Sequence, residues 1–191
     1  MNSSSSEPVA DRRARRTILL MVAICAAPVI ASYAAYYLWP RDTRINYGKL
    51  IATSAPALPE LASNGRSFHL EDLRGRWVML WSGRAPCAGL CAKAVYATRQ
   101  ARTMQNTEQD RVARLWIVSG PGNPDPALLT EHPGLVVASA PEDPLASWPE
   151  GDSAIYLVDP LGNLVLAWPG DPDIKKLAKD LDRLLRASRV G

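Results

Sequence analysis

Residues 77–91 read WVMLWSGRAPCAGLC, and the fold is predicted from this stretch outward. Its first part, Trp77–Trp81, is an unbroken apolar run, which is typical of a strand that is covered on both faces. After a glycine and a proline, the chain from Cys87 to about Asn106 is rich in the helix-forming residues Ala, Leu, Lys, Arg and Gln. The stretch therefore predicts a strand, a loop and a helix, with Cys87 and Cys91 where the helix begins.

Other segments are predicted as strands from their runs of apolar residues: Ser67–Leu70, Arg114–Ser119, Leu135–Ala138, Ala154–Val158 and Leu164–Trp168. The last two flank Asp159–Asn163, whose turn-forming residues predict an antiparallel hairpin. Asn64–Gly65 is another turn signal, and Glu71–Gly75 predicts a helical turn that a glycine closes. A final helix is expected after Asp171 as its cap, with Pro172 in its first position. This order of elements indicates one α/β domain.

Before this domain lies an apolar segment that is long enough to cross a membrane. Thr17–Leu38 is uncharged, and at about 1.5 Å per helical residue it spans a hydrocarbon core of roughly 30 Å. Aromatic residues that favour the headgroup layer gather at its C-terminal end, and Pro40 then stops the helix. Arginines before the segment place the N-terminus in the cytoplasm and the bulk of the chain outside. The residues concerned are Tyr33, Tyr36, Tyr37 and Trp39 at one end and Arg12, Arg13, Arg15 and Arg16 at the other.

A cleaved signal peptide and a lipoprotein signal ending at Cys25 are the alternatives for this segment. The run is longer than the usual signal-peptide core and lacks a clear cleavage site, although Ala31 and Ala34 leave the first alternative open. Ile24 stands where lipoprotein processing needs a small residue, so Cys25 is interpreted as an inert thiol within the membrane. We therefore expect a single-pass bacterial inner-membrane protein with a periplasmic domain.

Charge and motifs exclude several classes of function. The 191 residues carry a formal charge of +3, most of which lies in the N-terminal tail, so the rest of the chain is nearly neutral. Binding to nucleic acid depends on neutralising phosphates and is therefore not expected. The sequence shows no paired carboxylates, catalytic serine arrangement or phosphate-binding loop, so hydrolase and nucleotide-binding functions are not expected either.

The pair Cys87 and Cys91 carries the chemistry that the sequence predicts. At a helix N-terminus the exposed N–H groups and the macrodipole favour a thiolate, and Arg84 adds positive charge nearby. Residues four apart on a helix share a face, which would let both sulfurs reach each other or one ion. A structural disulfide is the alternative in an oxidising compartment, although a bridge over so few residues constrains the unfolded chain little. Thiol exchange, or binding of Cu(I), which prefers thiolates, uses both sulfurs better.

In this arrangement the chain resembles the Sco family, the thioredoxin-like assembly factors of cytochrome c oxidase. The resemblance covers roughly Ala57–Leu185 and rests on the membrane anchor, the CxxxC pair and the segments Leu73–Trp77, Leu115–Ser119 and Ile155–Gly162. It implies an α/β fold of the thioredoxin-like (peroxiredoxin/Sco-type) class that follows one N-terminal transmembrane helix. It also implies copper binding through both cysteines and one distant histidine, in maturation of the copper A centre of the oxidase.

The sequence departs from the family pattern at this copper site. The family histidine lies a few residues before the strand that Ile155–Val158 resembles, and by spacing Gly151 holds that position. The chain has only two histidines, of which His69 flanks a short strand and His132 lies in a turn, and neither is favoured as a ligand. Without an imidazole a Cu(II) state should be held poorly, whereas a Cu(I) site of two thiolates remains chemically feasible.

The function predicted from these residues is a membrane-anchored thiol-disulfide or Cu(I)-handling factor that assists assembly of the copper centre of cytochrome c oxidase. Cys87 is expected to be the attacking thiolate and Cys91 its partner, and the same two sulfurs are the expected Cu(I) ligands, with the third ligand absent. As an enzyme, the chain would be a thiol-disulfide oxidoreductase. The expected partner is an oxidase subunit or another assembly factor.

Two alternatives to this function are considered. One is a non-catalytic Sco-like adaptor that binds such a partner without copper. The other is a general periplasmic thiol oxidoreductase, which the CxxxC spacing favours less than CxxC would. The boundaries predicted are 1–16 for a cytoplasmic tail, 17–39 for the transmembrane helix, 40–56 for a tether and 57–188 for the thioredoxin-like domain.

Overall fold

The computed structural model of the protein describes residues 9–38 and 46–188. These residues belong to two compact units, Met1–Arg44 and Ile45–Gly191.

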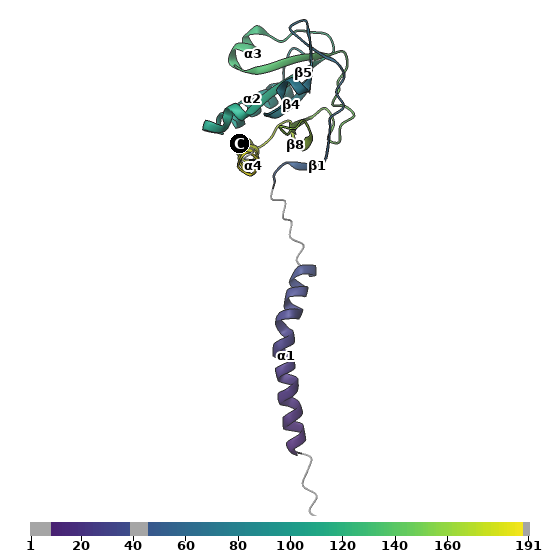
Figure 1. The fold of residues 1–191 in the computed structure, drawn as a ribbon, viewed down its shortest axis with the longest axis vertical. Helices are drawn as coiled ribbons and strands as arrows, with labels where there is room; N and C mark the ends of the chain where they lie inside the picture. Colours follow the sequence, from purple (N-terminus) through teal and green to yellow (C-terminus); the bar gives the residue numbers. More distant parts are fainter. Residues whose placement is uncertain (1–8, 39–45, 189–191) are drawn as a thin grey trace, which may run out of the picture. The chain divides into compact units, whose positions relative to one another are not determined.

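The first unit contains a single helix in its described part, α1 (Val9–Leu38), which Figure 1 shows as one continuous coil. The helix begins within the predicted cytoplasmic tail, because the Arg and Ala residues there are good helix formers. Its stretch Ala14–Ala34 has a mean hydropathy of 2.1 and is not buried, so it is apolar and long enough to be a membrane anchor or a signal sequence. Trp39 and Pro40, which were expected to mark its end, lie outside the described residues.

The second unit is built on one sheet, whose strand order in the described part of the chain is β1-β8-β7-β4-β5-β6-β2-β3. β4 is parallel to β5 and antiparallel to β7, and the predicted hairpin is confirmed as β7 and β8. The strands are β1 (Lys49–Ser54), β2 (Leu61–Ser63), β3 (Arg66–Phe68), β4 (Trp77–Gly83), β5 (Val112–Ser119), β6 (Leu135–Ala140), β7 (Ala154–Val158) and β8 (Leu164–Pro169). The helices are η1 (Leu70–Leu73), α2 (Leu90–Thr103), η2 (Asn106–Arg111), α3 (Pro126–Glu131) and α4 (Ile174–Ala187).

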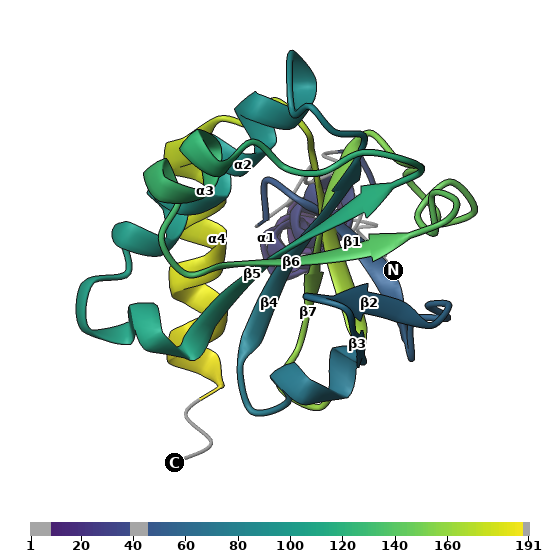
Figure 2. The ribbon, with the colours of Figure 1, turned by 90° about the horizontal axis from the view of Figure 1, so that it is seen from above.

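The two faces of the sheet are covered differently. Figure 2 shows α2, α3 and α4 on one side of the sheet, where a core that includes Trp81, Trp116 and Trp168 is buried. The opposite face is covered by η1 and by the loop between β6 and β7, which contributes Leu145 and Trp148 to a second core. Alternate side chains of β4 and β5 enter the two cores, which explains why both strands are continuous apolar runs in the sequence.

The segment 40–56, predicted to be a tether, contributes β1 over part of its described length. β1 pairs antiparallel with β8, with Leu50 opposite Leu166. Gly48 permits this approach, because a Cβ at this position would overlap Leu166 and lie 2.6 Å from Trp168 Nε1. The segment has little apolar periodicity of its own, and it is ordered as a strand because β8 offers an open edge of hydrogen-bonding groups. The folded unit therefore begins before the predicted boundary.

Asp180 on α4 joins this edge of the sheet to the helical layer. Its side chain is 2% exposed and accepts hydrogen bonds from Tyr47 N at 3.1 Å, Gly48 N at 2.8 Å and Trp168 Nε1 at 3.1 Å. Arg183 lies one turn along the helix, with its Nη1 3.9 Å from Asp180 Oδ1. A buried carboxylate is tolerated when its oxygens are paired in this way. One side chain therefore connects α4, β8 and the residues that lead into β1.

The cap of α4 is Asp173, not the predicted Asp171. Asp173 Oδ1 accepts a hydrogen bond from Lys176 N at 3.1 Å, in the first turn of the helix. Asp171 instead pairs with Lys93 Nζ of α2 at 2.5 Å, and Pro172 precedes the helix. Both aspartates match the preference for an N-cap, so the sequence pattern favoured the earlier one. In the structure the helix starts at Ile174, later than this pattern predicted.

Two buried basic side chains, Arg114 and His132, lie near one another beside α3. Arg114 is 2% exposed and donates from Nη2 to Pro133 O at 2.6 Å. Burial, with the charges of Arg102 and Arg99, lowers the pKa of Arg114 to about 10. Burial, and then the charge of Arg114, lowers the pKa of His132 below its ordinary value of 6.5. His132 is therefore neutral in the folded protein at neutral pH.

The pKa of His132 makes stability fall at mildly acidic pH. Below about pH 6.5, His132 of the unfolded chain binds a proton, whereas His132 of the folded chain binds it only at lower pH. The contribution of neutral His132 to stability is therefore complete above about pH 6.5 and is lost as the pH falls below that value. The melting temperature of the wild type is expected to fall more between about pH 7 and pH 5 than that of His132→Gln, which does not titrate. Parallel pH profiles for the two chains would contradict this prediction.

Candidate functional site

Cys87 and Cys91 follow the carboxyl end of β4, a strand in the middle of the sheet. The two residues are joined in a disulfide, and their Cα atoms are 5.2 Å apart. Such a separation is ordinary for a disulfide. Because β4, β5 and β6 run parallel and β7 runs opposite to β4, the loops after the first three strands and the residues before β7 meet at the same end of the sheet. The cysteine pair lies at this end, where β4 has its carboxyl terminus.

The helix after the pair begins later than predicted. α2 starts at Leu90, so Cys87 lies in the preceding loop and only Cys91 lies in the first turn of the helix. The N-cap residue Gly89 has φ +58°, a left-handed conformation that a right-handed helix cannot include. The expectation that Cys87 occupies the start of the helix is therefore wrong. The N–H groups and dipole at the start of α2 favour negative charge on Cys91.

The two sulfurs differ in exposure. Cys91 is 7% exposed, whereas Cys87 is only partly buried. An attacking thiolate would therefore reach Cys87 more easily than Cys91, and the role of Cys87 as the exchanging residue stays a prediction.

Trp81, Trp116 and Gly83 pack next to the disulfide. Trp116 Nε1 donates to Gly83 O at 3.2 Å, which holds the end of β4 in place. A Cβ on Gly83 would lie 3.0 Å from Trp81 Nε1 and 3.7 Å from Cys91 Sγ. Trp81 and Trp116 are 5% and 0% exposed, so both indoles are buried in the core. The absence of a side chain at Gly83 thus lets the Trp81 indole lie close to the backbone at the end of β4.

A groove of about 960 Å³ opens beside the cysteine pair. It is lined by the loop that holds the cysteines, by the loops after β5 and β6, and by the two residues before β7. Three of the lining residues are acidic, namely Glu142, Asp143 and Asp152, and the one basic residue is Arg84. Sequence reasoning did not select these acids. The parallel order of β4, β5 and β6 would have been the signal, because it brings the ends of the strands together.

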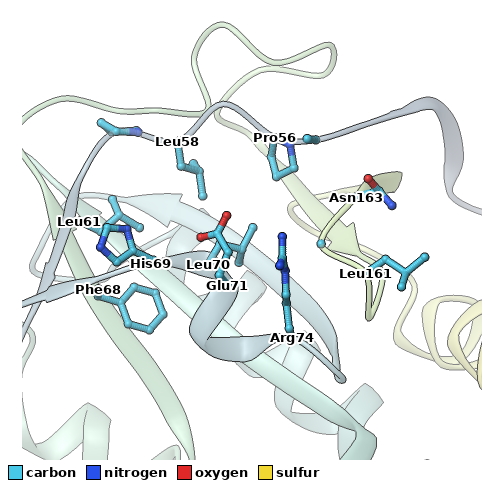
Figure 3. A pocket seen from close by; sticks show the side chains of 13 residues that line it. Pro56, Leu58, Leu61, Phe68, His69, Leu70, Glu71, Arg74, Leu161 and Asn163 are labelled. Carbon is cyan, nitrogen blue, oxygen red and sulfur yellow. The ribbon is translucent and has the colours of Figure 1, made fainter.

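Neither histidine lies at the cysteine groove. Figure 3 shows His69 with Glu71 and Arg74 around a separate pocket, whose other wall is Leu161 and its neighbours in the β7–β8 turn. This pocket is at the amino end of β4, and a strand of that length separates it from the cysteines by roughly 20 Å. His132 is 7% exposed and caps the C-terminus of α3. Neither residue is placed to join the two sulfurs.

The loop before β7 places Asp152 and Ser153, but not Gly151, on the wall of the groove. Gly151 has φ +70°, so a side chain there would be strained. Tyr156 holds the loop, because its hydroxyl donates to Gly151 O at 2.9 Å and accepts from Glu150 N at 3.1 Å. Within residues 9–38 and 46–188, no group of three or more His, Cys, Asp or Glu residues is arranged to hold a metal ion.

An α/β sheet with a disulfide just beyond its central strand, at the start of a helix, defines a thioredoxin-like protein. In agreement, residues 77–188 match the model of the family described as transmembrane-like, thioredoxin-like, C-terminal domain. The match covers more than half of the chain, and the protein belongs to this family. A comparison with curated proteins finds no match.

Solved structures of Sco proteins have the same fold. Yeast Sco1 has a TM-score of 0.57 at 18% identity, over 72% of this chain and 98% of its own. The copper-bound ScoI of Arabidopsis thaliana has a TM-score of 0.55 at 18% identity, over 70% of this chain and 99% of its own. Apo Sco1 of Thermus thermophilus has a TM-score of 0.55 at 17% identity, over 76% and 98%. These similarities confirm the predicted Sco-like, thioredoxin-like fold.

Proposed function

We propose that the chain is a membrane-anchored thiol-disulfide factor in which Cys87 and Cys91 are the redox pair. The observation that carries this proposal is the placement of an accessible disulfide beside an open groove, with the buried sulfur in the first turn of α2. As a purely structural bridge this disulfide would stabilise the fold little, because the loop that it closes is very short. We place α1 in the membrane, with the N-terminus in the cytoplasm and the domain in the periplasm, on the arginines that precede the apolar run.

The exchange reaction needs a partner protein with two thiols. A thiolate of the partner attacks Cys87 Sγ, the bond between Cys87 and Cys91 breaks, and the electron pair passes to Cys91 Sγ. The second thiolate of the partner then attacks its own sulfur in the mixed disulfide and releases Cys87 as a thiolate. The chain gains two electrons and the partner becomes a disulfide. The same steps in reverse oxidise the chain.

We further propose Cu(I) as cargo of the reduced pair, in assembly of the copper centre of cytochrome c oxidase. Two thiolates suit Cu(I), and the disulfide must be reduced before they are available. The Sco-like fold supports this proposal, and two solved relatives, from Arabidopsis thaliana and yeast, are copper-bound. The residues present do not fit Cu(II), because the lining of the groove contains no histidine. That observation favours the alternative, an adaptor that binds an oxidase subunit or assembly factor without copper.

The test uses the full chain in detergent micelles, reduced without oxygen. Cu(I) affinity is measured by competition with a chromophoric chelator, and the midpoint potential by equilibration with dithiol buffers. A reducible pair and one Cu(I) per chain, lost in Cys87→Ser, are expected. A reducible pair without Cu(I) binding would overturn the copper proposal alone. A disulfide that resists reduction, together with no Cu(I) binding, would overturn both proposals and support the alternative, an adaptor without copper.

Asp152→His is expected to raise Cu(II) affinity by at least about tenfold, which is about 1.4 kcal/mol. The reason is that residue 152, which follows the position that spacing assigns to the family histidine, lines the groove, so that an imidazole there would add a third donor to the two thiolates. Gly151→His is the matched control, because residue 151 does not line the groove. Equal affinities for the two variants, measured by competition, would contradict the assignment of residue 152 to this position.

A further inference from the structure

The groove beside the disulfide is negatively charged. Glu142 and Asp143 come from the loop after β6, Asp152 precedes β7, and Arg84 is the single base opposite them. None of the four forms an ion pair with any other residue that the structure describes. Asp143 Oδ1 accepts from Leu145 N at 2.9 Å, which fixes that carboxylate at the rim. The three carboxylates are therefore available to a bound molecule.

The floor of the groove carries a buried polar group with no partner. Ser82 is the last residue but one of β4, is 1% exposed, and lines the groove. Its hydroxyl makes no hydrogen bond within the described part of the chain. A buried hydroxyl is rarely left unpaired in a protein. A backbone carbonyl of a polypeptide lying in the groove would accept the hydrogen of this hydroxyl.

The groove ends at the redox pair. Ala88, Leu90 and Cys91 form part of its lining, so a segment that occupies it passes directly beside the disulfide. The volume of about 960 Å³ admits several residues of an extended chain. The carboxylates and the unpartnered hydroxyl are two features of the groove that do not depend on the cysteines. They indicate that a segment beside the disulfide carries positive charge and a free backbone carbonyl.

We propose that this groove binds an extended, positively charged segment of the thiol partner, with its cysteine at the disulfide and its Lys or Arg side chains facing the three carboxylates. The inference rests on the proposed thiol exchange and adds the chemical class of the substrate. Opposite charges in a partly enclosed site attract a ligand and raise its rate of association, and this effect weakens with salt. Small anionic thiols are repelled by the same carboxylates, so the site distinguishes a basic protein segment from an acidic thiol.

The test measures the rate at which two peptides reduce the disulfide of the full chain in neutral detergent micelles at low salt. One peptide carries a cysteine between lysines, and the other carries a cysteine between glutamates. The wild type is expected to react about tenfold faster with the lysine peptide, by electrostatic attraction. In Glu142→Gln/Asp143→Asn/Asp152→Asn the ratio of the two rates is expected to fall severalfold. Glu71→Gln, at the pocket of Figure 3, is the matched control and is expected to keep the wild-type ratio.

The outcomes separate the two proposals. If neither peptide reduces the disulfide of the wild type, the proposed function fails and this inference fails with it. If both peptides react and the triple variant keeps the wild-type ratio, only this inference is overturned. Glu142→Gln alone provides the same comparison if the triple variant does not fold, because the Glu142 side chain is exposed and makes no hydrogen bond or ion pair with the described residues. Ser82→Ala is expected to weaken binding of the lysine peptide, because it removes the hydroxyl that would donate to the peptide backbone.

Discussion

A reduced Cys91→Ser chain is expected to accumulate a stable mixed disulfide at Cys87 when an oxidised peptide is added. Cys87 is the more accessible sulfur and attacks the peptide disulfide, and no second thiol in the site is left to resolve the adduct. The wild type resolves the same adduct through Cys91 and returns to its internal disulfide. Non-reducing electrophoresis and intact mass would show nearly complete adduct in the variant and almost none in the wild type.

Cys87→Ser is the matched comparison for this result. Its remaining thiol, Cys91, is 7% exposed and is expected to form little adduct. Both variants are made with Cys25→Ser, because Cys25 is an exposed free cysteine of α1 and would add a background reaction. Equal adduct formation at the two sulfurs would contradict the assignment of Cys87 as the exchanging residue.

Asp180→Ala is expected to lower the free energy of unfolding of the domain by about 3–5 kcal/mol, the cost of leaving buried polar groups unpaired. The substitution removes the acceptor for Tyr47 N, Gly48 N and Trp168 Nε1. All three donors are at or near the junction of β1, β8 and α4, so none can turn to solvent without disturbing the sheet edge. Urea unfolding of the full chain in micelles, followed by tryptophan fluorescence, measures the change.

Asp182→Ala is the control for this prediction, since Asp182 lies on the same helix. Asp182 pairs with Arg186 at 2.9 Å on the surface, and such exposed pairs contribute about 0.5 kcal/mol or less. Asp180→Asn keeps one acceptor oxygen and is expected to fall between the two alanine variants. If Asp180→Ala and Asp182→Ala lowered the free energy of unfolding by the same amount, Asp180 would not be the residue that joins α4 to β8 and β1.

Whether the reduced chain binds copper depends more on the residues around Cys87 and Cys91 than on the two sulfurs themselves. Two thiolates at the end of a central strand suit a soft monovalent ion, but the loop that would supply a third donor offers Asp152 and Ser153. Carboxylate and hydroxyl oxygens prefer harder cations than Cu(I). These residues suit the proposed basic segment better than a copper ion, and the Cu(I) affinity of the reduced chain tests whether the pair also carries a metal.

The central strands, the β7–β8 hairpin and the apolar helix α1 were predictable from the sequence. Each depends on neighbours in the chain: the run Trp77–Trp81, the turn residues around Asp159, and the uncharged stretch after Arg16. The start of α2 was misplaced, although Gly89 was visible, because a glycine near a helix start shows its left-handed φ only in the folded chain.

What the sequence by itself determined was the order of the central strands, the hairpin and the two long helices of the domain, the apolar N-terminal helix and the presence of two cysteines able to form a pair. Tertiary structure alone decided three things: that β1 adds to the sheet, that the buried Asp180 accepts from two donors more than 130 residues away, and that the acids near residues 142 and 152 share one groove with Cys91. The physical reason is the range of the interactions. Periodicity and turn chemistry act between adjacent residues, whereas a sheet edge, a buried carboxylate and a groove exist only when distant segments meet.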